Sequence, residues 1–393
     1  MQQVSQSPTD PAFVQDPYPF YDHARALAPL VFWEDYAMAA AFGHAEVHAL
    51  LRDRRFGRER PGELPFDAPA HLAPWLKTEA HSMLGAEPPR HTRLRGLVLR
   101  AFTSRRIQAL APEIETLCQS LIDAFPTEPF DLLAAYCTPI PVVVICRLLG
   151  VPEEDASKLL GWSHKMVAMY QASRTRATED AAAAAAAAFT DYLTSYVVQR
   201  RKTPKDDLIT QLIAAEEDGA RLSTDELIGT CILLLNAGHE ATVHGLGNGV
   251  KTMLSLGLGP DWLTAPQCGA TVEEILRFDP PLHMFTRYAY EEVLIAGHTF
   301  RRGEEVALML AAANRDPQVW EAPARFWPAR PGTAHTSLGG GLHFCVGAPL
   351  ARLEMQIALP ILFARCPDLR LTEAPVYSDT YHFHGLTRLM VAR

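Results

Sequence analysis

A glycine-rich segment near the C-terminus carries the strongest chemical signal in this sequence. Three consecutive glycines, Gly339–Gly341, precede Cys345, and Gly347 and Pro349 follow it. Glycine lets a backbone lie close against a flat ligand, and proline is tolerated in the first turn of a helix. A cysteine at a helix N-terminus is favoured as the thiolate, the form that binds a metal. The segment therefore predicts that Cys345 is a metal ligand.

The other cysteines give no such signal. They are scattered without a Cys-x-x-Cys pair, so neither a zinc site nor a disulfide framework is predicted. We interpret them as small buried hydrophobic residues with free thiols. They are Cys118, Cys137, Cys146, Cys231, Cys268 and Cys366.

The segment from Ser337 to Arg352 closely resembles the haem-binding loop of the cytochrome P450 family. The family pattern is Phe-x-x-Gly-x-His-x-Cys-x-Gly with Leu-Ala-Arg soon after, and Leu338 stands here in place of Phe. The resemblance implies haem b (iron protoporphyrin IX) with Cys345 as its thiolate ligand, which favours O–O cleavage in this family. The alternative is a glycine-rich turn around a buried cysteine.

Two further motifs resemble those around the family's haem. Glu274 and Arg277 match a Glu-x-x-Arg pair, and Arg325 matches the third member of a buried, structural ion network, although such pairs alone are common on solvated helices. His91 and Arg95, at i,i+4 on an expected helix, match propionate contacts, as do Arg287 and His343. A buried dianionic edge requires such donors.

The segment from Leu235 to Thr242 resembles the family's Ala-Gly-x-Glu-Thr-Thr stretch over the distal haem face. Glu240 matches the acid in proton delivery. The next position usually carries an alcohol and is Ala241 here, while Thr242 is rotated by about 100° around the helix. We therefore predict that proton delivery does not use the usual alcohol. Glu240 relays protons through water, and either Thr242, through a local bulge of the helix, or a hydroxyl of the substrate completes the chain.

The elements that position these residues are mostly helical. The pattern predicts a β-hairpin from Leu30 to Phe42, a helix over 91–102, a helix pair over 153–172 and 178–201, and a long helix opened by a capping box at Ser223. The alanine run 181–188 predicts a surface helix of high propensity. We expect a mainly α fold with a small β region, the single-domain cytochrome P450 fold, over residues 1–393.

Composition limits the partners. The net charge is −9 and dense Lys/Arg tracts are lacking, so nucleic acid is not expected. Residues 1–11 are polar, without an apolar run, so we expect no membrane anchor and a cytoplasmic location.

The resemblance implies a haem-thiolate monooxygenase that inserts one atom of O2 into a small apolar organic substrate. No flavin- or nicotinamide-binding segment is recognisable, so two electrons are expected from a ferredoxin or flavodoxin with an NAD(P)H-dependent reductase. A basic docking patch is expected from five arginines: Arg95, Arg100, Arg105, Arg106 and Arg352. The alternatives are a peroxide-using or non-hydroxylating haem-thiolate enzyme (dehydrogenation, coupling or rearrangement) and a haem sensor or carrier.

By family analogy, the segments expected to line the substrate pocket are largely apolar. Within or next to them lie three histidines, His283, His382 and His384. Each could bind a polar group of the substrate, but a packing or surface position is the simpler interpretation. The expected segments are 61–87, 166–170, 234–238, 284–285 and 381–386.

Overall fold

The computed structural model describes residues 1–215, 221–332 and 334–393. The chain divides into two compact units, each described here by itself. Unit 1 comprises residues 1–64, 115–137 and 241–393, and unit 2 comprises residues 65–114 and 138–240.

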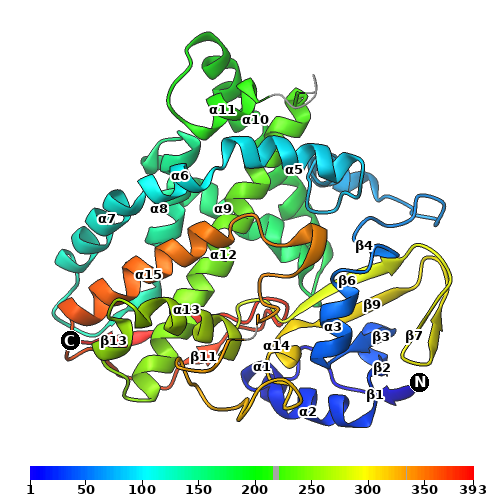
Figure 1. The fold of residues 1–393 in the computed structure, drawn as a ribbon. Coiled ribbons are helices and arrows are strands. Elements are labelled where there is room, and N and C mark those ends of the chain that lie inside the picture. The colour runs from blue at the N-terminus through cyan, green and yellow to red at the C-terminus, as the bar shows by residue number, and fades with distance from the viewer. Residues whose placement is uncertain (216–220, 333) are drawn as a thin grey trace. The chain divides into compact units, whose positions relative to one another are not determined.

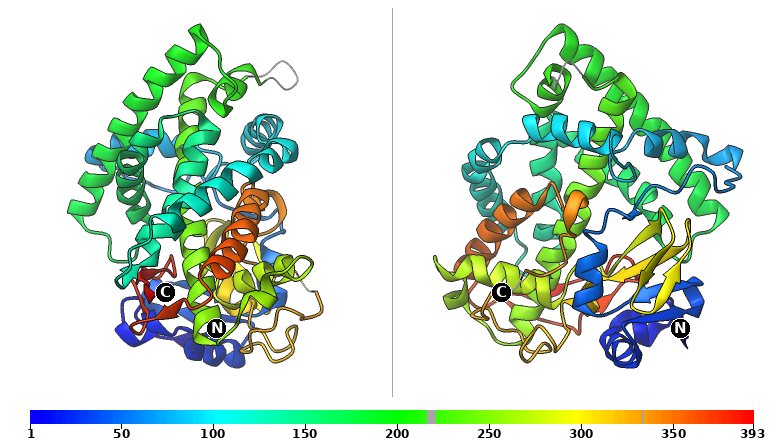
Figure 2. Two further views of the ribbon diagram at one scale, coloured as in Figure 1. Left: turned by 90° about the vertical axis from the view of Figure 1, so that its left-hand side faces the viewer. Right: turned by 45° about the vertical axis from the view of Figure 1, so that its right-hand side comes forward.

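Unit 1 contains the β structure. Its largest sheet has six strands in the order β1-β2-β3-β9-β6-β4, in which strands from residues 2–57 pair with β6 and β9 from residues 284–309 (Figures 1 and 2). The strands are β1 (Gln2–Val4), β2 (Leu30–Trp33), β3 (Met38–Ala41), β4 (Phe56–Gly57), β6 (Met284–Ala289) and β9 (Glu305–Met309). Strands β2 and β3 pair antiparallel from Leu30 opposite Ala41 to Trp33 opposite Met38, which confirms the predicted hairpin.

An aromatic core packs against this sheet. Phe13, Tyr21, Trp33 and Phe42 are buried, and their rings meet edge-on or tilted. Such aromatic pairs stabilise a core beyond the area that they bury. This core therefore supports the sheet that contains β6 and β9.

Unit 1 also contains smaller sheets and several helices. Two smaller sheets have the order β10-β13-β5 and β11-β12, and β7 and β8 form a hairpin. These strands are β5 (Phe130–Asp131), β7 (Val293–Ile295), β8 (His298–Phe300), β10 (Arg370–Leu371), β11 (Val376–Tyr377), β12 (Leu386–Arg388) and β13 (Met390–Ala392). The helices are α1 (Pro11–Gln15), α2 (Tyr18–Leu27), α3 (His44–Leu50), α13 (Gln267–Phe278), α14 (Leu310–Ala313), α15 (Ala348–Arg365) and most of α7 (Ala111–Asp123).

Unit 2 is helical. Its helices are α4 (Ala73–Ala80), α5 (Arg90–Ala101), α6 (Ser104–Ala109), α8 (Pro139–Leu149), α9 (Ala156–Val167), α10 (Arg176–Lys202) and α11 (Leu208–Ala214). Helices α9 and α10 pack against each other, in agreement with the predicted helix pair, and α5 agrees with the helix predicted over 91–102.

The alanine run on α10 differs from its prediction. Four of its residues, Ala182, Ala183, Ala185 and Ala186, are buried, whereas Ala184 and Ala187 are exposed. Helix α10 contacts α9 on one side and α4 and residues 70–72 on another. The methyl side chains thus permit close packing of helices, and the prediction of a surface helix was wrong for this face.

Helix α12 (Thr224–Ser255) crosses the boundary between the two units, which falls after Glu240. Its capping box is formed as predicted: the Glu226 amide donates to Ser223 Oγ at 3.2 Å, and the Ser223 amide donates to Glu226 Oε2 at 2.8 Å. Such reciprocal bonds satisfy amides that have no partner within the helix.

The predicted mainly α fold with a small β region is confirmed. The prediction of one domain over residues 1–393 stays a prediction. Within the described parts of the chain, none of the helices combines the length and the apolar character that crossing a bilayer requires.

Candidate active site

Cys345 lies in a closed loop of unit 1, between the short 3-10 helix η7 (Gly341–His343) and α15. Its amide donates to the Leu338 carbonyl at 2.9 Å, and its carbonyl accepts from the Ala348 amide at 3.4 Å. Pro349 occupies the first turn of α15, as predicted. The cysteine therefore lies directly before a helix start, held by backbone hydrogen bonds on both sides.

The glycine run is required by packing within the protein. Gly341 has φ +62°, and a Cβ at this residue would lie 2.6 Å from the carbonyl oxygen of Leu51. Gly339 has φ +70°, and its Cβ would lie 3.5 Å from the Phe285 ring. Only glycine adopts these conformations without strain. At Gly341 the backbone of Leu51, next to α3, thus leaves no space for a side chain.

The thiol of Cys345 differs in its surroundings from the others. Burial raises the pKa of Cys118 to about 11 and that of Cys146 and Cys231 to about 12. Burial likewise raises the pKa of the remaining three, Cys137, Cys268 and Cys366. Five of these six cysteines are buried, as predicted, whereas Cys268 is half-buried.

Cys345, in contrast to these six cysteines, lies near the guanidinium of Arg352. Arg352 donates to both carboxylate oxygens of Glu273, at 2.6 and 2.8 Å. The pKa of Arg352 is raised, mainly by this hydrogen bonding to Glu273 and to a smaller extent by the negative charge of Cys345. Because a nearby cation stabilises a thiolate, this environment suits a metal-binding sulfur.

A buried ion network supports the segment before the loop. Arg277 donates to both oxygens of Glu274 at 2.7 Å, and to the carbonyls of Asn314 and Pro323 at 2.8 and 3.0 Å. Arg277 and Glu274 are 1% and 4% exposed, so their charges depend on these partners.

The third member of this network differs from the prediction. Arg325 contributes its backbone carbonyl, 3.2 Å from Arg277 Nη2, while its own side chain is exposed. The side chain of Arg330 is directed inward instead, with Nε 3.5 Å from Glu274 Oε2. The assignment of Arg325 to the ion network was therefore wrong, because the chain turns inward only at Arg330.

Hydrogen bonds of Asn314 connect this network to the Cys345 loop. Its side-chain amide donates to Ser337 Oγ at 2.7 Å, and its oxygen accepts from the Thr336 amide at 2.7 Å. Ser337 Oγ in turn donates to the Leu276 carbonyl at 2.6 Å. The start of the loop is thereby fixed to the end of α13.

Two of the predicted propionate ligands belong to unit 1. Arg287 lies on β6, is 2% exposed and donates from Nη1 to the Thr286 carbonyl at 2.8 Å. A Cβ added to Gly339 would lie 3.5 Å from the ring of the adjacent Phe285, so this strand lies beside the Cys345 loop. His343 ends η7, two residues before Cys345, and is half-buried.

The other two lie on α5 of unit 2. His91 is 3% exposed and Arg95, one turn later, is half-buried. The helix is fixed by Arg93, which forms an ion pair with Glu226 in the first turn of α12. The contact of all four residues with propionates stays a prediction.

The middle of α12 combines small residues with a buried acid. Ala237 is exposed and Gly238 and Ala241 are half-buried, whereas Glu240 and Thr242 are 8% and 5% exposed. Glu240 Oε1 lies 3.2 Å from His164 Nε2 of α9 and 3.4 Å from His239 Nε2. The sequence analysis missed both histidines, since nothing in the sequence pairs His164 with a residue that lies far along the chain.

The three histidines considered as polar anchors have different positions. His283 and His384 are buried at 0% and 3% exposure, and His384 stacks on the Tyr377 ring at 3.7 Å. Burial lowers the pKa of His382 and of His384 to about 4. All three belong to unit 1, and the packing interpretation holds for His283 and His384.

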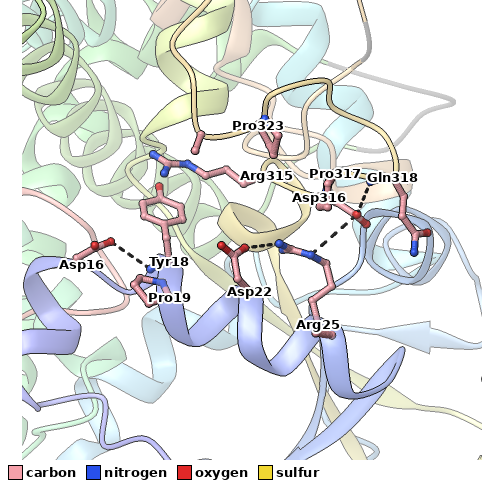
Figure 3. Close-up of a pocket in the computed structure, with 12 residues that line it drawn as sticks. Asp16, Tyr18, Pro19, Asp22, Arg25, Arg315, Asp316, Pro317, Gln318 and Pro323 are labelled. Atoms are coloured by element: carbon pink, nitrogen blue, oxygen red, sulfur yellow. Dashed lines mark hydrogen bonds and ion pairs between the residues drawn. The ribbon is translucent and has the colours of Figure 1, made fainter.

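A surface cleft of about 510 Å³ in unit 1 is separate from these residues (Figure 3). Its charges have partners within the protein: Arg25 pairs with Asp22 and lies 4.0 Å from Asp316, and Arg315 lies 3.4 Å over the Tyr18 ring. We therefore assign it no ligand.

Comparison with known proteins decides the family. A family model described as cytochrome P450 matches residues 266–367. The chain is 37% identical over 379 residues to cytochrome P450 monooxygenase PikC of Streptomyces venezuelae, covering 92% of this chain and 87% of that enzyme. It is also 37% identical over 394 residues to vitamin D(3) 25-hydroxylase of Pseudonocardia autotrophica, covering 96% and 94%. The chain belongs to the cytochrome P450 family.

The fold comparison agrees. The crystal structure of P450BioI in complex with hexadec-9Z-enoic acid ligated acyl carrier protein superposes with a TM-score of 0.90 at 33% identity, covering 97% of this chain and 99% of that chain. The predicted cytochrome P450 fold and monooxygenase function are confirmed, and the non-hydroxylating and sensor alternatives are not favoured. The family implies a haem-thiolate cofactor.

The residues of this P450 fit such a cofactor. Cys345 offers sulfur beside a guanidinium, and Leu342 and Phe344 of the same loop are 36% and 39% exposed, which gives the loop an apolar surface. The buried guanidinium of Arg287 on the adjacent strand provides donors for a carboxylate. A flat, largely apolar ligand with acidic substituents matches this set.

Proposed function

We propose that this P450 holds haem b through the Cys345 thiolate and inserts one atom of O2 into a small apolar organic substrate. The observation that carries the proposal is the position of Cys345, at a helix start and near Arg352, in contrast to six thiols whose pKa burial raises. When bound, the haem supplies the iron that activates O2. His91, Arg95, Arg287 and His343 would bind its propionates as donors.

The protein's own part in proton delivery centres on Glu240. Ala241 has no donor, and Glu240 is the buried carboxylate of this helix segment. His239 donates from Nδ1 to the Leu235 carbonyl at 2.6 Å, and its Nε2 lies 3.4 Å from Glu240 Oε1. Glu240 is thus placed to hold a proton and to pass it on, with Thr242 in a smaller role.

Electrons are proposed to come from a ferredoxin or flavodoxin with its NAD(P)H-dependent reductase. Of the predicted docking arginines in unit 2, Arg100 and Arg105 are exposed, Arg95 is half-buried and Arg106 pairs with Asp206 at 3.0 Å. In unit 1, Arg352 is bound to Glu273. The two exposed side chains, Arg100 and Arg105, are therefore expected to contribute most to docking. A cytoplasmic location stays a prediction.

Turnover under isotopically labelled dioxygen tests this function. Purified protein would be supplied with NAD(P)H, a surrogate ferredoxin and its reductase, after spectral titration of a compound library has found a ligand that displaces water from the ferric iron. One labelled oxygen atom is expected in the product, and omission of the ferredoxin should abolish its formation. An unlabelled product, or an equal rate with peroxide alone, would contradict the proposal.

A further inference from the structure

Helices α9 and α12 bring together three side chains of unit 2 whose donor atoms suit a metal ion. They are His164 Nε2, His239 Nε2 and an oxygen of Glu240, and all three atoms lie within 4.8 Å of one another. Glu240 Oε1 is 3.2 Å from His164 Nε2 and 3.4 Å from His239 Nε2. Two imidazoles and one carboxylate form a donor set that zinc enzymes use.

The measured separations match the geometry of tetrahedral zinc. Bonds of about 2.0 to 2.2 Å to nitrogen and oxygen place neighbouring ligand atoms about 3.4 Å apart. Both carboxylate-to-imidazole separations are already at this value. The two imidazole nitrogens lie within 4.8 Å of each other, and the side chain of His164 is 55% exposed, so it can rotate to complete the geometry.

His239 is oriented for this role by its second nitrogen. Its Nδ1 donates to the Leu235 carbonyl at 2.6 Å, which places the proton on Nδ1 and the lone pair of the neutral ring on Nε2. Among the described residues, Nε2 has no hydrogen-bond partner, although the side chain is 3% exposed. Metal-binding histidines are typically fixed in this way by a carbonyl. A buried and unpartnered nitrogen directed at a carboxylate is therefore an independent sign of a missing ligand.

We propose that His164, His239 and Glu240 bind a divalent transition metal ion such as Zn²⁺ reversibly. The exposed His164 gives the ion a route from solvent, and three protein ligands leave a fourth position for water. A consequence for turnover follows, which rests on the proposed role of Glu240 in proton delivery. A metal-bound carboxylate does not carry a proton, so zinc should slow product formation.

The binding test uses the ferric holoenzyme and zinc alone. Protein would be incubated with Zn²⁺ in chelator-treated buffer, passed through gel filtration and analysed for zinc and iron by mass spectrometry. One zinc per iron is expected for the wild type, with affinity about 10-fold or more weaker in His164→Gln and in His239→Gln. His23→Gln, an exposed histidine on α2, is the control and should retain zinc. Undiminished zinc in His164→Gln, or an equal loss in His23→Gln, would overturn the site.

A second arm separates the metal site from the role of Glu240. Product formation should fall with zinc in the wild type and recover on addition of a chelator, while His164→Gln should be insensitive to the same zinc concentrations. Stoichiometric zinc without any change in turnover would support the metal site and overturn the role of Glu240 in proton delivery. Loss of turnover without bound zinc would overturn the metal site.

Discussion

The Cys345 loop and the middle of α12 show two different ways of building a reactive region. Behind the loop, Arg277, Glu274 and Asn314 are buried, and their hydrogen bonds fix both the start of the loop and the end of α13. On α12 the proposed chemistry depends on one buried carboxylate, Glu240, with two histidines near it. The first region holds its buried charges through several fixed hydrogen bonds. In the second, the proposed proton carrier has imidazole nitrogens at 3.2 and 3.4 Å.

The two regions also differ in how far they match the family pattern. The loop matches it apart from Leu338, whereas the α12 segment departs from it at Ala241. The following predictions test this contrast.

The largest effect is expected from Arg277→Ala. Among the described residues, the substitution leaves the buried Glu274 carboxylate with Arg330 at 3.5 Å and the Trp327 amide at 2.7 Å as partners. We expect the free energy of unfolding to fall by about 3 to 5 kcal/mol, as for other broken buried ion pairs. Chemical denaturation with haem absorbance as the probe would measure it.

Arg325→Ala is the matched control for this network. Its side chain is exposed, and only its backbone carbonyl contacts Arg277, so the stability should change by less than about 0.5 kcal/mol. If Arg325→Ala were as damaging as Arg277→Ala, the inward placement of Arg330 would be wrong.

Glu240→Ala should affect catalysis rather than stability. General acid–base catalysis typically contributes about 100-fold or more, so we expect a loss of product formation of that order. Thr242→Ala should cost less, because Thr242 is rotated away from the position of the usual alcohol. Product and peroxide formed per NAD(P)H consumed would be measured for both variants. If Glu240→Ala left both quantities unchanged, Glu240 would be only a polar residue of the helix.

A smaller effect is expected from Ala241→Thr. The position is half-buried, and the added hydroxyl supplies the donor that the family usually has. We expect the variant to be tolerated and to release less peroxide with poorly coupled substrates. Ala241→Val, of similar size but without a donor, is the control. An equal fall in peroxide for both variants would show that filling space, not proton donation, is responsible.

The smallest effect concerns electron supply. The rate should fall as ionic strength rises under conditions where reduction is limiting, because exposed charges are screened over about 10 Å at 0.1 M salt. Arg105→Gln should weaken this dependence more than Arg106→Gln, whose guanidinium already pairs with Asp206. A rate independent of salt would argue against a basic docking patch.

The sequence predicted the elements that local patterns determine. The β2–β3 hairpin, the capping box of α12 and the proline start of α15 each follow from neighbouring residues, and all three are confirmed. Contacts between distant segments were less predictable. Arg325 and Arg330 are only five positions apart, and the sequence did not show which of the two guanidinium groups would lie near Glu274.

The histidines near Glu240 show the same limit. His164 lies on a different helix, and its contact with Glu240 depends on how α9 packs in unit 2. The buried alanines of α10 were also missed, since a helix of high propensity gives no sign of which face its neighbours will cover. In each case packing over long sequence distances supplied the information that local patterns lack.

The central claim is that Cys345 binds the haem iron as a thiolate, and the spectrum of the reduced carbon monoxide complex tests it most directly. The wild type should show the red-shifted band of a thiolate ligand, and Cys345→His should lose it while retaining haem. Cys366→Ser, which removes a thiol whose pKa burial raises, should leave the band unchanged. A band that survives in Cys345→His, or disappears in Cys366→Ser, would contradict the account.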